Sequence, residues 1–158
     1  MQLSGTAKLS VHGKRLVAES MYAKGKSFLA AAMLLRRKGG YEYVVLHLLC
    51  QGIEITLKAM LLAIDYDTFK PKLKKLGHNL VSVADTLASA TKFSAPKGNV
   101  KAELTALSNL YSQHLLRYGS GYDILVNPST IPSNRVLRRV AALLRLVERK
   151  GSIYARNI

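Results

Sequence analysis

Residues 41–64 read YEYVVLHLLCQGIEITLKAMLLAI, a nearly continuous apolar stretch that polar side chains interrupt at regular intervals. The intervals are three or four positions, so at about 100° per residue the polar side chains fall on one stripe of a helix. They are Tyr43, His47, Gln51, Glu54 and Lys58. A helix that is apolar on its other faces is normally buried, and buried polar groups need partners. The stretch therefore predicts a central helix whose polar stripe faces a polar cavity or a paired polar surface.

Helical periodicity continues along the rest of the chain, and strand patterns are almost absent. Besides 41–64, the expected helices cover about residues 17–38, 77–91, 100–118 and 133–150. Residues 65–75 are interpreted as a loop, because Pro71 interrupts a run of lysines there. This pattern predicts an all-α fold: an antiparallel four-helix up-and-down bundle with an additional C-terminal amphipathic helix.

A chain of 158 residues has the length of one domain. We expect an N-terminal extension at residues 1–16, one helical bundle at 17–150 and a C-terminal tail at 151–158. The irregular stretch at 119–132 holds two glycines and two prolines and is longer than a bundle connection requires. Loops of this length are often functional.

The chain is strongly basic, with 24 Lys and Arg against 9 Asp and Glu, for a net charge of +15. Such an excess favours an anionic partner, which could be nucleic acid, a nucleotide, an acidic protein or an anionic membrane surface. The alternative is a soluble protein that happens to be basic. Charge indicates the kind of partner and the association rate, and it says nothing about the fold.

Cys50 is the only cysteine, which excludes an intrachain disulfide and a cysteine-based zinc site. Three histidines fall on three different expected helices without an i,i+4 pair or an acidic cluster, so we expect no metal and no cofactor. The first 16 residues lack the apolar core of a secretory signal. Gln51, Glu54 and Lys58 would each be costly inside a bilayer. A cytoplasmic protein without membrane contact is expected.

A second set of polar side chains lies on the expected helix at 100–118. Tyr111, His114 and Tyr118 are three and four positions apart and share a face with apolar residues, so that face should point inward. The stripe of the 41–64 helix could supply their partners. Two interpretations are open: a structural polar network that satisfies itself, or a cavity lined for a ligand.

Two more positions have both a structural and a functional interpretation. Asn79 or His78 could cap the helix that starts near Gly77, or the helix start could contact a phosphate. Arg117 could complement a helix dipole, or it could turn inward and hold a phosphate. The candidate ligand-binding residues are therefore His47, Gln51, Glu54, Lys58, His78, Asn79, Tyr111, His114, Arg117 and Tyr118.

The last helix carries a row of arginines opposite an apolar face. Such a row is either a solvated face or an anion-binding surface, and arginine binds phosphate better than lysine does. A run of lysines at 70–75 has the same ambiguity. The candidate anion-binding surface consists of Lys72, Lys74, Lys75, Arg135, Arg138, Arg139, Arg145 and Arg149.

These residues together resemble the HEPN domain family. The resemblance lies in LHLLCQGIEITLKA at 46–59, in Gly77-His78-Asn79-Leu80, in Tyr111 and in Arg117-Tyr118, and it covers about residues 18–118. It implies an up-and-down bundle of four or five helices that is commonly dimeric. Many HEPN domains are metal-independent RNases that use an Arg-x(4–6)-His motif. Others bind nucleotide or RNA, or pair with small nucleotidyltransferases.

The sequence departs from the RNase pattern, because no histidine follows His114 and the Arg-x(4–6)-His motif is absent. Without that arginine and histidine, the usual mechanism has no general acid or base. The expected function is a non-catalytic HEPN-like domain that binds nucleotide or RNA through the inter-helix cavity and the basic surface, and a homodimer is expected. One alternative is a dimerisation or partner module for a nucleotidyltransferase. Another is an RNase that uses Arg117, Tyr111 and either His114 or His78.

Overall fold

The computed structural model describes residues 8–118 and 124–150, and all regular structure in these two ranges is helical. The expected all-α bundle is confirmed. Its up-and-down order of four antiparallel helices stays a prediction, and residues 1–7, 119–123 and 151–158 lie outside the described residues. The elements are α1 Val11–Arg37, α2 Glu42–Ile64, α3 Tyr66–Leu76, α4 Leu80–Ala90, α5 Gly98–Ser112, the 3-10 helix η1 Pro128–Thr130 and α7 Asn134–Arg149.

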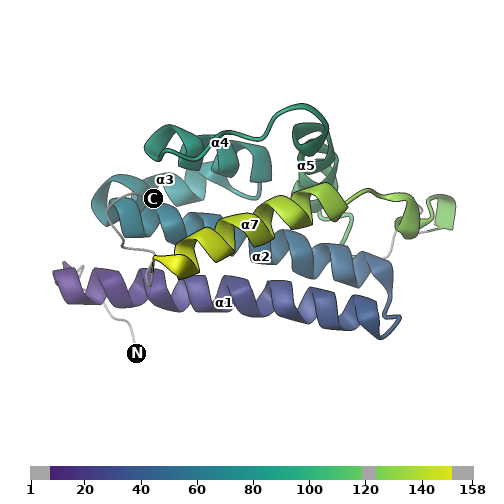
Figure 1. Cartoon of the computed structure of the whole chain (residues 1–158), viewed down its shortest axis with the longest axis horizontal. Helices are drawn as coiled ribbons and strands as arrows, with labels where there is room; N and C mark the ends of the chain where they lie inside the picture. Colours follow the sequence, from purple (N-terminus) through teal and green to yellow (C-terminus); the bar gives the residue numbers. More distant parts are fainter. Residues whose placement is uncertain (1–7, 119–123, 151–158) are drawn as a thin grey trace.

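The long helices α1 and α2 lie antiparallel and side by side (Figure 1). Glycines let their backbones approach closely. A Cβ atom added to Gly25 would lie 2.2 Å from Thr56 Oγ1 and 2.7 Å from Thr56 N, and one added to Gly52 would lie 2.7 Å from Leu29 Cγ. Only glycine fits such a contact, so these two positions fix how the helix pair meets.

Helix α2 forms the centre of the core, with Leu46, Leu49, Ile53 and Leu61 each at most 1% exposed. It contacts α1, α3, α4, α5 and η1. Helix α7 contacts α5 and passes in front of α2 in the view of Figure 1. Among the described residues, α2 is the one helix long and apolar enough to cross a membrane, yet 72% of its most apolar window is buried. That burial is the pattern of a core helix in a soluble protein.

The prediction of a loop at 65–75 was wrong, because residues 66–76 form α3. Asp65 caps this helix: its Oδ1 accepts a hydrogen bond from Thr68 N at 3.0 Å, and its Oδ2 accepts from Thr68 Oγ1 at 2.7 Å. Phe69, 9% exposed, anchors the helix to the core. Pro71 removes only one i→i−4 hydrogen bond, which the cap and the anchor offset.

Helix α1 begins at Val11, six residues before the expected start. The cap is Ser10, whose Oγ accepts from Gly13 N at 3.1 Å. Serine is a favoured N-cap, but Val11, His12 and Gly13 are weak helix formers, so the sequence carries only part of the signal for this boundary. Part of the expected N-terminal extension is therefore helical.

We predict that Gly25→Ala lowers the free energy of unfolding by about 1–3 kcal/mol, because the new methyl group forces the α1 and α2 backbones apart. Urea denaturation followed by far-UV circular dichroism measures the change. Gly13→Ala is the matched control on the same helix, since its Cβ would meet no atom closer than 3.4 Å. A Gly25→Ala protein as stable as the Gly13→Ala protein would contradict the close contact.

Candidate functional site

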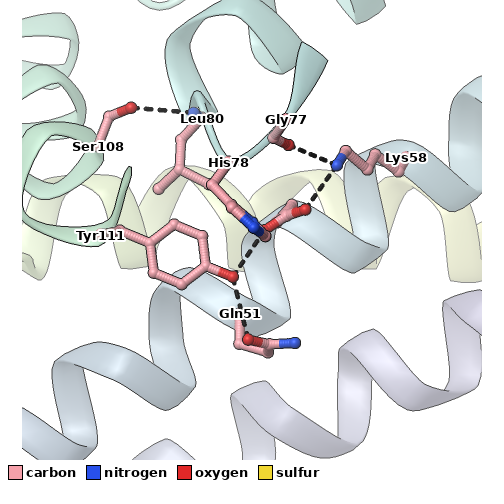
Figure 2. A network of polar contacts seen from close by, with 8 residues as sticks. Gln51, Lys58, Gly77, His78, Leu80, Ser108 and Tyr111 are labelled. Atoms are coloured by element: carbon pink, nitrogen blue, oxygen red, sulfur yellow. Dashed lines mark hydrogen bonds and ion pairs between the residues drawn. The ribbon is translucent and has the colours of Figure 1, made fainter. Parts of the chain in front are cut away.

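The carboxylate of Glu54 is the centre of a buried polar network. Figure 2 shows the residues Lys58, His78 and Tyr111 that contact it. Lys58 Nζ donates to Glu54 Oε1 at 2.5 Å, and the Tyr111 hydroxyl donates to Glu54 Oε2 at 2.6 Å. His78 Nδ1 lies 2.9 Å from the same Oε2 atom, and the Tyr111 hydroxyl also lies 3.0 Å from Gln51 Oε1. The stripe of α2 therefore faces inward, as the spacing predicted, and α5 supplies Tyr111 as its partner.

The chain between α3 and α4 brings His78 to this carboxylate. Gly77 has a φ of +54°, a conformation that favours glycine and ends α3. Lys58 Nζ donates to the carbonyl oxygen of Gly77 at 2.6 Å, as Figure 2 shows, so the lysine also holds the turn in place. This backbone partner could not be predicted from the sequence, because it depends on the tertiary packing of α2 against the turn.

Of the two interpretations of the α4 start, the structure supports capping by Asn79. The Asn79 side chain accepts from Ser82 N at 2.9 Å, and Leu80 N donates to Ser108 Oγ at 3.0 Å. These bonds occupy amide groups that an anion would otherwise contact. Asn79 is therefore a structural residue here, whereas His78 turns away from the cap and toward Glu54.

The network sets the protonation of its members. Burial alone would raise the pKa of Glu54, but hydrogen bonds from His78, Lys58 and Tyr111 together outweigh it and hold that pKa below its usual value. Burial, and then the hydrogen bond to Glu54, raise the pKa of Tyr111. Glu54 is thus an anion and Tyr111 a neutral donor at neutral pH. Burial likewise raises the pKa of Cys50, which makes this thiol a poor nucleophile.

His114 has an unusual backbone conformation that places it at the edge of the network. Helix α5 ends at Ser112, six residues before the expected end, and His114 has a φ of +60°. Leu115 N donates to Leu110 O and His114 N to Tyr111 O, both at 3.1 Å, which is a common helix ending around a left-handed residue. Glycine normally takes that position. The turn brings the His114 ring to 5.7 Å from the His78 ring, between centroids.

His47 and Arg117 complete this edge. Burial lowers the pKa of His47, and the positive charges of Arg117 and His114 lower it further. Arg117 belongs to the same turn as His114, because its backbone N donates to His114 O at 3.0 Å. His47 Nδ1 is buried without a hydrogen-bond partner among the described residues. The rings of His47 and Tyr111 have centroids 5.8 Å apart. We call His47, His78, His114 and Arg117 the histidine–arginine mouth.

The structure separates the predicted site residues into three groups. Gln51, Glu54, Lys58 and Tyr111 form the interior network and are hydrogen-bonded to one another, which favours the structural interpretation there. The four residues of the mouth lie at its rim. Tyr118 was expected to face inward, but it is 69% exposed, because the chain leaves the helix at Ser112 and no longer follows its face. The irregular segment 119–132 is described only from residue 124 onward.

The arginines of α7 are exposed, as their spacing predicted, while Val136, Val140 and Val147 are buried on the opposite face. Two of them have partners within the protein. Arg135 lies 3.6 Å from Glu103 Oε2, and Arg139 donates to Ser94 O at 3.3 Å. On α3, Lys72 lies over the Phe69 ring at 5.3 Å, and Lys74 and Lys75 are exposed. The basic surface is thus solvent-facing on both helices.

Among residues 8–118 and 124–150, no group of three or more His, Cys, Asp and Glu side chains is arranged to hold a metal ion. Comparison with known proteins adds no assignment. No protein-family model matches the chain, and neither a curated protein nor a solved structure matches it. The function must therefore be argued from the site itself.

We predict that Lys58→Met lowers the free energy of unfolding by about 3–5 kcal/mol, because it leaves a buried carboxylate without its cation. Chemical denaturation at neutral pH measures this loss. Lys26→Met is the matched control: its ion pair with Glu148 is 3.0 Å long and exposed, and removing an exposed pair costs about 0–1 kcal/mol. Equal losses in the two variants would contradict the role of Lys58.

A second prediction concerns pH. The pKa of His47 in the folded protein lies below its ordinary value of 6.5. As the pH falls below 6.5, the unfolded chain binds a proton there more readily than the folded chain, so stability present above that pH is lost. We expect His47→Gln to reduce the fall in melting temperature between about pH 7.5 and pH 5.5. If the melting temperature of the variant falls as much as that of the wild-type protein, burial does not lower the pKa of His47 as described.

Proposed function

We propose that this protein binds a nucleotide or RNA, with a phosphate group held at the histidine–arginine mouth. One observation carries the proposal: the rings of His47 and His78 both lie against Tyr111, the His114 ring lies against His78, and Arg117 follows in the same turn as His114. A guanidinium and imidazole N–H groups are strong donors to phosphate oxygens. Glu54 does not oppose an anion strongly, because Lys58 already neutralises it.

The charge of the whole chain supports the same proposal. A net charge of +15 attracts polyanions over a distance, and the exposed lysines of α3 and arginines of α7 offer further phosphate contacts. His78 is 43% exposed, so its ring can contact a base or ribose while its Nδ1 atom stays on Glu54. Phosphate contacts of this kind position a nucleic acid without reading its sequence.

The resemblance to HEPN domains supports the proposal further, because the residues that carry it are members of the network and the mouth: Glu54, Lys58, His78, Tyr111 and Arg117. A homodimer, a nucleotidyltransferase partner and a cytoplasmic location stay predictions of that resemblance and of the sequence.

Fluorescence anisotropy with a labelled single-stranded RNA, competed by ATP and by inorganic phosphate, tests the proposal. We expect measurable binding at low salt that weakens as salt rises, because counterions are released on binding. Arg117→Ala should weaken binding by about tenfold, the cost of one charge-assisted contact. Arg37→Ala is the matched control, because Arg37 is an exposed arginine in the last turn of α1, outside both the mouth and the basic surface of α3 and α7. No binding at low salt, or equal losses in both variants, would contradict the proposed site.

A second candidate function, RNA cleavage, is favoured by the contact between Glu54 and His78. If His78 Nδ1 carries the proton given to Glu54, its Nε2 atom is free to act as a base, and the carboxylate stabilises the imidazolium that forms. His78 would take the proton of a ribose 2′-hydroxyl, whose oxygen then attacks the adjacent phosphorus. His114 would protonate the departing 5′-oxygen. The products are a 2′,3′-cyclic phosphate and a 5′-hydroxyl, and no other reactant is needed.

An RNA with one 5′-bridging phosphorothiolate bond tests this candidate, because its thiolate leaves without a proton. We expect the wild-type protein to cleave ordinary RNA but not the 2′-deoxy analogue. His114→Ala should lose cleavage of ordinary RNA and regain it on the phosphorothiolate, whereas His78→Ala should lose both. Wild-type protein that binds RNA without cleaving it would exclude this second function and leave the binding proposal intact.

A further inference from the structure

A cavity of about 190 Å³ lies between α7 and the side of the core formed by α2, α4 and α5. Its walls include the buried side chains of Ile53, Leu87, Leu104 and Val140, and the loop at residues 93–96 lies along one side. Protein cores are close-packed and contain few voids larger than a water molecule. The lining of this cavity is mostly apolar and offers water few hydrogen-bond partners, so the cavity is suited to an apolar group.

The cavity has a charged side chain in its lining, and this side chain defines the kind of ligand. Among the described residues that line it, Arg139 is the only charged one, and no acidic side chain is present. Arg139 is exposed, and within the described part of the chain its guanidinium donates to Ser94 O at 3.3 Å. A guanidinium has five donors, so most of its capacity is available to an anion.

We propose that this cavity binds a medium-chain carboxylate, with the alkyl chain between α4, α5 and α7 and the carboxylate on Arg139. Charge complementarity selects this occupant: an apolar chamber with a lone cation at its edge matches an apolar chain that ends in one negative charge. An apolar cavity of about 150 Å³ accepts benzene, so the present one has room for a chain of about six to eight carbons. The site is separate from the histidine–arginine mouth and does not depend on the function proposed there.

Titration of ¹⁵N-labelled full-length protein with octanoate, octan-1-ol and acetate tests the site by NMR. We expect octanoate to saturate and to shift the amide signals of Leu87, Phe93 and Val140. Octanol, which lacks the charge, should bind about tenfold more weakly, and acetate, which lacks the chain, should not saturate.

Two variants test the contributions of the apolar cavity and of Arg139 separately. Ala88→Leu places a larger side chain in the cavity and should abolish octanoate binding. Arg139→Gln should reduce octanoate affinity to that of octanol, while the control Arg138→Gln, one residue away and outside the lining, should leave it unchanged. Because Arg139 is exposed, Arg139→Gln should fold normally. This variant therefore still tests the proposal if Ala88→Leu does not fold. Octanoate that does not saturate, that binds no better than octanol, or that is unaffected by Ala88→Leu in folded protein would overturn the proposal.

Discussion

The buried carboxylate of Glu54 imposes the constraint on which the rest of the site depends. It lies on the central helix, among the buried residues of α2, and is 6% exposed. An unpaired charge in such a place would be very costly, so the fold must bring partners to it. Lys58 comes from the same helix, His78 from the turn between α3 and α4, and Tyr111 from the end of α5. A single charge thereby connects the central helix to two other parts of the bundle.

The groups that pair with the Glu54 carboxylate also position the residues of the histidine–arginine mouth. Lys58 holds the Gly77 carbonyl, which fixes the turn that carries His78. The left-handed residue that ends α5 is a histidine where glycine would be easier, and its ring lies against His78. Backbone strain of this kind is concentrated at functional sites in proteins generally. The mouth is thus a direct result of how the interior network is built, and both proposed functions at that site follow from it.

The helical fold could be predicted from the sequence, because apolar residues recur at spacings of three and four positions, which is the period of a helix. The inward direction of the polar stripe could be predicted as well, because polar groups on a buried helix need partners. The sequence was insufficient where a local signal conflicted with tertiary contacts. Pro71 favoured a loop, yet Asp65 and Phe69 stabilise α3 around it. The spacing of Tyr111, His114 and Tyr118 favoured one continuous helix, but the left-handed turn at His114 redirects the last two. No glycine marks that turn, so only the three-dimensional packing reveals it.

The central claim is that Glu54 fixes the orientation and the tautomer of the His78 ring. Long-range ¹H–¹⁵N correlation spectra of the imidazole, recorded above the pH at which histidine side chains titrate, test this claim most directly, because the two neutral tautomers give different nitrogen shifts. We expect His78 to be protonated at Nδ1 and unprotonated at Nε2. A ring protonated mainly at Nε2, or one that exchanges freely between both forms, would contradict it.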